Sequence, residues 1–174
     1  MNETITTLIS RRSVRKYKPI PVDESDLKLI LKAGTYAATA MGKQSPVIVV
    51  VRDIDTIREI EKLNAAVLGD ENGRPFYGAQ TLAIVFCDTR LSSNCLQDGS
   101  LVMGNLMNAA YSLGIDSCWI NRAAEVFKSE SGKALMKKWG LDDNFIGIGN
   151  CILGYRDGEL PEAKPRKENY IIWN

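Results

Sequence analysis

The chain has 174 residues, of which 45% are hydrophobic and 25% charged, a composition typical of one soluble globular domain covering residues 1–174. Its 22 basic and 21 acidic residues leave a net charge of +1, so its overall field does not favour a nucleic-acid partner. The sequence contains no histidine. This excludes Ser-His-Asp and Cys-His catalysis and every histidine-ligated metal site, and we expect no metal centre.

The four cysteines form no CxxC pair, so their spacing predicts neither a zinc site nor a thiol-exchange site. Cys87, Cys118 and Cys151 lie in or beside apolar runs, and we expect them to be buried and reduced. No apolar run approaches membrane-spanning length, and the N-terminus places its charges after a short apolar stretch, the reverse of a secretory signal. These features predict a cytoplasmic protein without a membrane partner.

The first predicted elements are two helices and a strand. Residues Glu3–Ser10 carry apolar side chains at helical spacing, and Pro19 and Pro21 keep the following segment extended. A second helix is predicted from an Asp23 cap to near Gly34. The β-branched run Val47–Val51 then predicts a strand that is covered on both faces.

The middle of the chain contains the longest predicted helix. Helical spacing returns over Ile54–Leu68, followed by a polar loop at Gly69–Pro75 and a buried strand at Thr81–Cys87. The next helix, Leu96–Leu113, is apolar on almost all sides, which is typical of a helix buried all round. In a chain this small, a second subunit most simply supplies the missing cover.

The last part of the chain contains two more strands and one helix. Strands are predicted at Ser117–Ile120 and Phe145–Leu153, and a helix at Ser129–Trp139. The remaining residues are extended and end with the apolar segment Tyr170–Trp173. Helices and strands therefore alternate along the chain, which predicts an α+β fold with one sheet flanked by helices.

Two basic segments stand out against the balanced total charge. In an extended chain Arg11, Ser13 and Arg15 project to the same side, and two guanidinium groups with a hydroxyl suit the oxygens of a phosphate. Near the C-terminus, Lys164 and Arg166 also share one side of an extended segment. If the two segments converge, they form a discrete anion pocket.

Two other interpretations of these basic segments remain open. Both segments could be ordinary solvated faces of the protein. The first could instead be a nucleic-acid arm with Tyr17 and Tyr36 as stacking aromatics, although Val14, Ile20 and the near-zero net charge argue against that interpretation.

The sequence offers few side chains for catalysis of its own. The glycine-rich run Gly147–Gly154 has Ile152 where a dinucleotide-binding loop needs its third glycine, and it lies within a predicted strand, where glycine permits close approach. No P-loop occurs, and the acidic pairs neighbour predicted helix starts, where carboxylates act as caps. A phosphate-sized basic site with so little acid–base equipment indicates a bound cofactor that supplies the reactivity.

Several motifs together resemble the FMN-dependent nitroreductase family. They are Arg11–Tyr17 (RRSVRKY), Ala37–Pro46 leading into VIVVV, Leu113–Ile120, Ile152–Tyr155 and Lys164–Arg166. Each motif alone is weak, but they occur in the family's order over essentially the whole chain.

This resemblance implies an α+β fold with a central mixed, mainly antiparallel sheet, and an intertwined homodimer with two interfacial FMN sites. Arg11, Arg12, Ser13 and Arg15 would hold the phosphate, ribityl chain and pyrimidine edge. The other implied FMN-binding residues are Lys164 and Arg166 at the phosphate, Gly42 and Gln44 from the second subunit, Trp119 beside the ring, and the backbone of Ile120 and Asn121 facing the flavin N5.

The implied activity is hydride transfer from NADH or NADPH through flavin N5 to a nitroaromatic, a quinone or a similar small acceptor. Donor and acceptor would use the same place in turn, which is a ping-pong mechanism without catalytic side chains. Arg15 would supply positive charge near the pyrimidine edge. The alternatives are a non-catalytic flavin carrier or sensor with the same fold, and a flavin-free basic module that binds acidic partners.

The sequence departs from the family pattern in two places. Many relatives have asparagine where this chain has Gly42, and Gln-Pro-Trp where it has Gln44-Ser45-Pro46. Losing the asparagine hydrogen bond would weaken FMN binding by roughly 1 kcal/mol. The region Leu63–Tyr77 is also too short for a large helical lid over the substrate.

Overall fold

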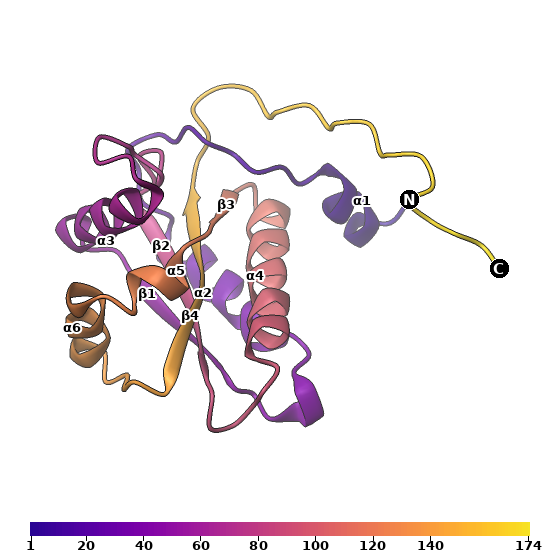
Figure 1. Cartoon of the computed structure of the whole chain (residues 1–174). Coiled ribbons are helices and arrows are strands. Elements are labelled where there is room, and N and C mark those ends of the chain that lie inside the picture. Colours follow the sequence, from indigo (N-terminus) through magenta and orange to yellow (C-terminus); the bar gives the residue numbers. More distant parts are fainter.

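A four-stranded sheet in the order β1-β2-β4-β3 forms the middle layer of the computed structural model, which describes all 174 residues (Figure 1). Its strands are β1 (Pro46–Val51), β2 (Thr81–Asp88), β3 (Asp116–Ile120) and β4 (Phe145–Gly154). Every neighbouring pair of these strands is antiparallel. The predicted α+β class with a mainly antiparallel sheet is therefore confirmed, and its one parallel pairing is an isolated bridge between Ser13 and Ser117.

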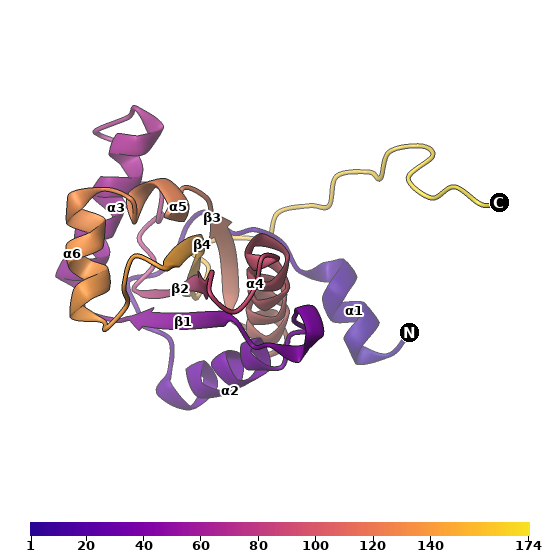
Figure 2. The same cartoon turned by 60° about the horizontal axis from the view of Figure 1, so that its bottom comes forward.

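Helices cover both faces of this sheet (Figures 1 and 2). One face carries α3 (Ile54–Leu68), α5 (Ala123–Val126) and α6 (Glu130–Lys138), and the other carries α2 (Glu24–Thr35) and α4 (Cys95–Ser112). The central strand β2 serves both layers because its side chains alternate. Leu82, Ile84 and Phe86 enter the core under α3, α5 and α6, whereas Ala83, Val85 and Cys87 enter the core under α2 and α4.

The predicted elements occur with boundaries shifted by a residue or two. The Asp23 side chain accepts a hydrogen bond from the backbone of Ser25 at the start of α2, as its predicted role as a cap requires. Two elements were not predicted, namely α5 and the 3₁₀ turn at Ala40–Gly42. Both are shorter than the span over which a 3.6-residue period can be recognised.

Strand β1 is covered on both faces as predicted, but it forms one edge of the sheet. Val49 and Val51 pack on the α3 side, and Ile48 and Val50 pack on the α2 side. Because nothing in the chain pairs with its outer side, most of its residues are only half-buried. An apolar run therefore predicts coverage of its faces without indicating its position in the sheet.

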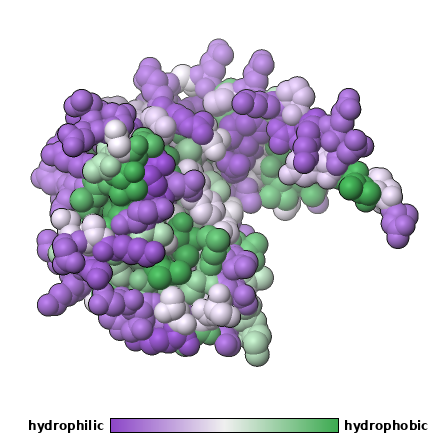
Figure 3. All heavy atoms as spheres, viewed as in Figure 1, coloured by the Kyte–Doolittle hydropathy of each residue, from purple (hydrophilic) through white to green (hydrophobic).

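Helix α4 is apolar on most sides but is not buried on all of them within one chain. Its inner face contains Val102, Met103 and Leu106, which are buried, whereas Leu101 is 51% exposed. Helix α1 (Glu3–Ser10) projects from the body, contacts α4 and has no buried residue. Figure 3 shows hydrophobic residues on the hollow side between this arm and the body. No helix, α4 included, is both long and apolar enough to cross a bilayer.

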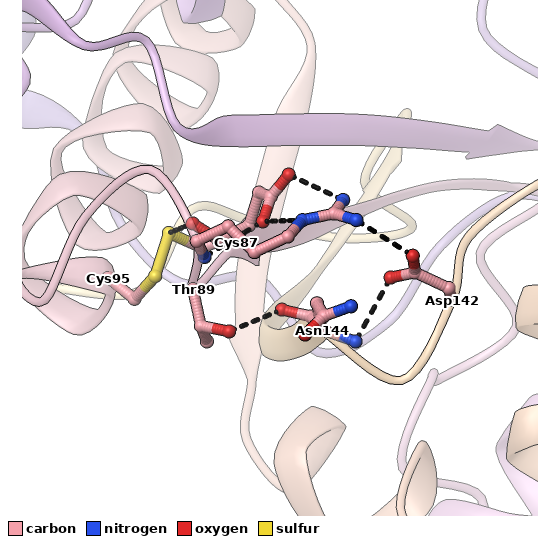
Figure 4. A network of polar contacts seen from close by, with 7 residues as sticks. Cys87, Thr89, Cys95, Asp142 and Asn144 are labelled. Carbon is pink, nitrogen blue, oxygen red and sulfur yellow. Dashed lines mark hydrogen bonds and ion pairs between the residues drawn. A yellow bond between two sulfur atoms is a disulfide. The ribbon is translucent and has the colours of Figure 1, made fainter.

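The prediction that Cys87 is reduced is wrong, because Cys87 and Cys95 form a disulfide (Figure 4). Cys87 is near the end of β2 and Cys95 is the first residue of α4, and the loop between them reverses direction so that their Cα atoms are 5.5 Å apart. A spacing of eight residues gives no sign of this reversal. The other two cysteines, Cys118 and Cys151, are free and buried as predicted.

Candidate cofactor site

The basic segment Arg11–Tyr17 lies along the outer side of β3. Ser13 forms a parallel bridge with Ser117, and the Val14 amide donates a hydrogen bond to the Ser117 carbonyl at 3.1 Å. Val14 and Tyr17 are buried, and the Tyr17 hydroxyl donates to the Val14 carbonyl at 2.8 Å. Backbone pairing and two buried side chains thus hold the segment in the extended form predicted from its prolines.

Arg11, Ser13 and Arg15 all lie close to Cys118 in β3. Burial raises the pKa of the Cys118 thiol, and Arg15, Ser13 and Arg11 partly oppose this shift. The Nη1 atom of Arg11 is buried and has no hydrogen-bond partner in the chain. Two guanidinium groups and a hydroxyl are therefore brought together, with an N–H group left to bind an anion.

Arg12 is placed differently from its neighbours. Its Nη1 donates to the carbonyls of Ile9 and Arg11, both at 2.8 Å, so the side chain folds back over the end of α1. Its Nε atom is buried without a partner. Arg12 consequently stabilises the last turn of α1 and has only part of its guanidinium available for a ligand.

Gly42 and Gln44 lie in the loop 39–45, which contains the 3₁₀ turn. Met41, Gly42 and Gln44 all have positive φ angles, of 55°, 66° and 51°, and Met41 is 90% exposed. Glycine and asparagine are the residue types that best tolerate this left-handed conformation. The departure from asparagine at Gly42 therefore keeps the backbone shape and removes only the side chain.

A buried carboxylate that the sequence analysis overlooked holds this loop. Asp98 in α4 accepts hydrogen bonds from the Ala40 amide at 2.8 Å and from the hydroxyls of Ser45 and Ser92, both at 2.9 Å. A signal was present in the sequence, because Asp98 is the only charged residue between Cys95 and Ile115. A lone charge inside an apolar helix needs buried partners.

The end of β3 is held by a second unpredicted residue, Asn64 of α3. Its Nδ2 donates to the Asn121 carbonyl at 2.8 Å, and its Oδ1 accepts from Arg122 Nε at 3.2 Å. Asn121 itself is exposed, Ile120 is buried, and Arg122 has a φ of 75°. The turn at which the predicted backbone contacts lie is thus fixed by a fully buried amide side chain.

Trp119 packs toward α4 rather than outward. An added side-chain carbon at Gly149 would lie 2.7 Å from its indole nitrogen and 3.1 Å from the end of Met103. The glycines of β4 therefore permit close packing against the sheet, as predicted, and form no nucleotide-binding loop. The indole N–H is buried and has no partner in the chain.

Lys164 and Arg166 belong to an exposed C-terminal tail that extends away from the body (Figures 1 and 2). Arg166 Nη2 donates to the Lys164 carbonyl at 2.6 Å, and no hydrogen bond or ion pair joins either side chain to the segment Arg11–Tyr17. The predicted convergence of the two basic segments does not occur within one chain.

Comparison with known proteins gives consistent matches. Residues 8–83 match the model of the nitroreductase family. A protein of Archaeoglobus fulgidus with a combined NADH dehydrogenase and NAD(P)H nitroreductase name is 28% identical over 163 residues, covering 91% of this chain and 88% of that protein. An NADPH-flavin oxidoreductase of Vibrio harveyi is 26% identical over 192 residues, covering 99% of this chain and 73% of that protein. The crystal structure of a nitroreductase with bound FMN from Bacteroides fragilis NCTC 9343 is 28% identical, covers 99% of this chain and 98% of that chain, and gives a TM-score of 0.90.

Proposed function

We propose that the chain is a member of the nitroreductase family and an FMN-dependent oxidoreductase. It would take electrons from NADH or NADPH and reduce nitroaromatics, quinones or similar electron-poor small molecules. The observation that supports this function best is the group formed by Arg11, Ser13 and Arg15 beside Cys118, with a buried N–H of Arg11 left unpaired.

The residues present fit an FMN phosphate. A phosphate oxygen would satisfy the unpaired Nη1 of Arg11, which otherwise costs free energy in a buried position. Arg15 and the Ser13 hydroxyl add positive charge and a further donor on the same segment. FMN held here would supply the hydride chemistry, which explains how a chain without histidine can serve as an oxidoreductase.

The geometry supports a site made by two subunits. Loop 39–45 is bound near the N-terminal end of α4 through Asp98, whereas the segment Arg11–Tyr17 runs beside β3, which follows the C-terminal end of α4 (Figure 1). An 18-residue helix is about 27 Å long. Gly42 and the arginines therefore lie toward opposite ends of this helix. We infer that a homodimer brings the loop of one subunit to the arginines of the other.

Exposed apolar residues support the same homodimer. Ile5, Leu8 and Ile9 of α1, Leu101 of α4, and the tail Tyr170–Trp173 are all exposed in one chain. Burying such residues is the main driving force for stable association between subunits. The exposed tail that contains Lys164 and Arg166 could then reach a site on the partner.

The chain's own residues would bind and orient the reactants. Arg11 and Arg15 would stabilise negative charge on the phosphate and near the pyrimidine edge. Asn64 would keep the backbone of Ile120 and Asn121 in place beside the reacting ring. Because the chain provides no histidine at the site, protons would come from solvent, and donor and acceptor would bind in turn by a ping-pong mechanism.

The region proposed to border the substrate is short and well held. Glu61 of α3 accepts a hydrogen bond from the Phe76 amide at 2.8 Å and lies 3.7 Å from Arg74. The chain between α3 and β2 therefore forms a small loop against α3 and contains no helix. Without a helical lid the site would be open, which suits acceptors of varied shape. The same openness keeps a non-catalytic flavin carrier or sensor as the second candidate.

One spectroscopic titration tests both candidates. The purified protein is mixed with FMN, and its visible absorbance is recorded anaerobically before and after addition of NADH and, separately, of NADPH. Bleaching of the bound flavin within seconds supports the reductase and identifies its donor. A flavin that binds and stays oxidised supports the carrier or sensor, and a protein that binds no FMN contradicts both. Parallel double-reciprocal lines in steady-state kinetics would support the ping-pong mechanism.

A further inference from the structure

The carboxylate of Asp98 lies where three parts of the chain meet. It is 3% exposed and projects from the first turn of α4. One oxygen accepts a hydrogen bond from the Ala40 amide, and the other accepts hydrogen bonds from the Ser45 and Ser92 hydroxyls. Ala40 and Ser45 bracket the loop that contains Gly42 and Gln44, and Ser92 lies in the loop closed by the Cys87–Cys95 disulfide.

We propose that Asp98 is a positioning residue for cofactor binding, because it holds loop 39–45 in the conformation that presents Gly42 and Gln44 to the FMN of the partner subunit. This inference rests on the proposed function. Asp98 would touch neither the flavin nor the substrate, and its effect would pass through the loop backbone.

The loop needs such support because its own backbone conformation is costly. Met41 and Gln44 are side-chain-bearing residues with positive φ, a conformation that costs about 1 kcal/mol or more per residue. Three hydrogen bonds within the loop offset part of this cost. The Gln44 amide donates to the Thr39 hydroxyl, and the amides of Gly42 and Lys43 donate to the carbonyls of Thr39 and Ala40. The two hydrogen bonds to Asp98 tie the two ends of the loop to one rigid helix, which keeps its span fixed.

The test compares Asp98→Ala with Asp98→Asn by FMN fluorescence titration of the whole 174-residue chain. Removing a charged acceptor of three hydrogen bonds should weaken FMN binding about tenfold or more. The asparagine amide can still accept from Ala40 and can donate to the serine hydroxyls, so Asp98→Asn should recover most of the affinity. Ser45→Ala removes only the hydrogen bond from Ser45 to Asp98, so its affinity for FMN should lie between those of Asp98→Ala and Asp98→Asn.

A second readout does not depend on flavin. Lys43 is exposed in the loop, so limited trypsin digestion reports how firmly the loop is held. Cleavage after Lys43 should be faster in Asp98→Ala than in the wild-type protein. Asp53→Ala is the matched control, because it removes the cap of α3 and lowers stability without touching loop 39–45.

The outcomes separate positioning from general stabilisation. If Asp98→Ala binds FMN as the wild type does, or if Asp53→Ala loses as much affinity at equal stability, the proposal is overturned. If Asp98→Ala does not fold, the other two variants decide the question. Asp98→Asn should then bind FMN more tightly than Ser45→Ala and should be cleaved more slowly after Lys43, and the reverse order overturns the proposal. A wild-type protein that binds no FMN overturns the proposed function, whereas the anchoring of the loop is still judged by the rate of cleavage after Lys43.

Discussion

The segment Arg11–Tyr17 and the loop 39–45 are both proposed to contact the cofactor, but they are held in different ways. The segment is fixed by backbone pairing with β3 and by the buried side chains of Val14 and Tyr17. The loop is held at both ends by one carboxylate that lies more than fifty residues further along the chain, and its Ser45 carbonyl also accepts a hydrogen bond from the Asp88 amide. Backbone pairing tolerates most substitutions, whereas the loop depends on Asp98.

The largest expected change in FMN affinity comes from substitutions in the segment Arg11–Tyr17. Replacing Arg11 and Arg15 together by alanine should raise the Kd for FMN about a hundredfold or more, because two charge-assisted interactions are lost. Fluorescence titration measures the Kd. Lys18→Ala is the matched control, since Lys18 is an exposed cation directly after this segment. Equal losses in the control and the double variant would show that general positive charge, rather than this pair, binds the phosphate.

The sheet beneath the segment should lose stability in alkali. Burial raises the pKa of Cys151 to about 12 and also raises that of Cys118. The folded state therefore keeps these thiols protonated at a pH at which the unfolded chain, with thiol pKa values near 9, releases their protons. The contribution of the buried thiols to the free energy of unfolding is complete below pH 9 and is lost as the pH rises toward 12. Cys151 alone should lower the free energy of unfolding by about 1.4 kcal/mol per pH unit in this range. Urea titrations of the wild type and Cys151→Ala check this, and an equally steep decline in the variant would contradict it.

The loop should respond to its side chain at position 42. Gly42→Asn keeps the left-handed conformation and restores a side-chain amide, so FMN binding should tighten about fivefold. Gly42→Ala should weaken binding slightly, because alanine is strained at a φ of 66°. Unchanged affinity in Gly42→Asn would indicate that this position does not face the flavin.

The smallest expected effect is the response of the loop to acid. Burial acts to raise the pKa of Asp98, but the Ala40 amide, the Ser45 and Ser92 hydroxyls and nearby Lys43 outweigh it and hold the pKa below 3.8. This stabilisation is present above pH 3.8 and is lost as the pH falls through the lower pKa of the folded state. Hydrogen exchange of the Ala40 amide should therefore quicken, beyond its intrinsic rate, below about pH 4. The same acid dependence in Asp98→Asn would contradict this assignment.

The contrast between the two regions also explains what the sequence could predict. Local patterns such as the alternation around Val14, the spacing of helix residues and the prolines after Lys18 determine elements of secondary structure. These patterns predicted the class of fold and the extended basic segment. The three-residue turn at Ala40–Gly42 and the four-residue α5 are too short to leave such a pattern.

The contacts of Asp98 and Asn64 depended on long-range geometry instead. Their partners are backbone, hydroxyl and guanidinium groups that lie more than fifty residues away in the chain, except for Ser92. The disulfide was missed for a related reason, because only the reversal between β2 and α4 brings Cys87 near Cys95. The edge position of β1 likewise depends on which strands pair, and its apolar sequence does not determine that.

The state of the four cysteines has a practical consequence for labelling the protein. Two are joined in the disulfide and two are buried, so the folded chain presents no thiol to an alkylating reagent. A single cysteine introduced at an exposed position, such as Met41 in the loop, would be the one site open to a maleimide dye or spin label. The natural cysteines would not need to be removed first, and the loop could be followed directly as cofactor binds.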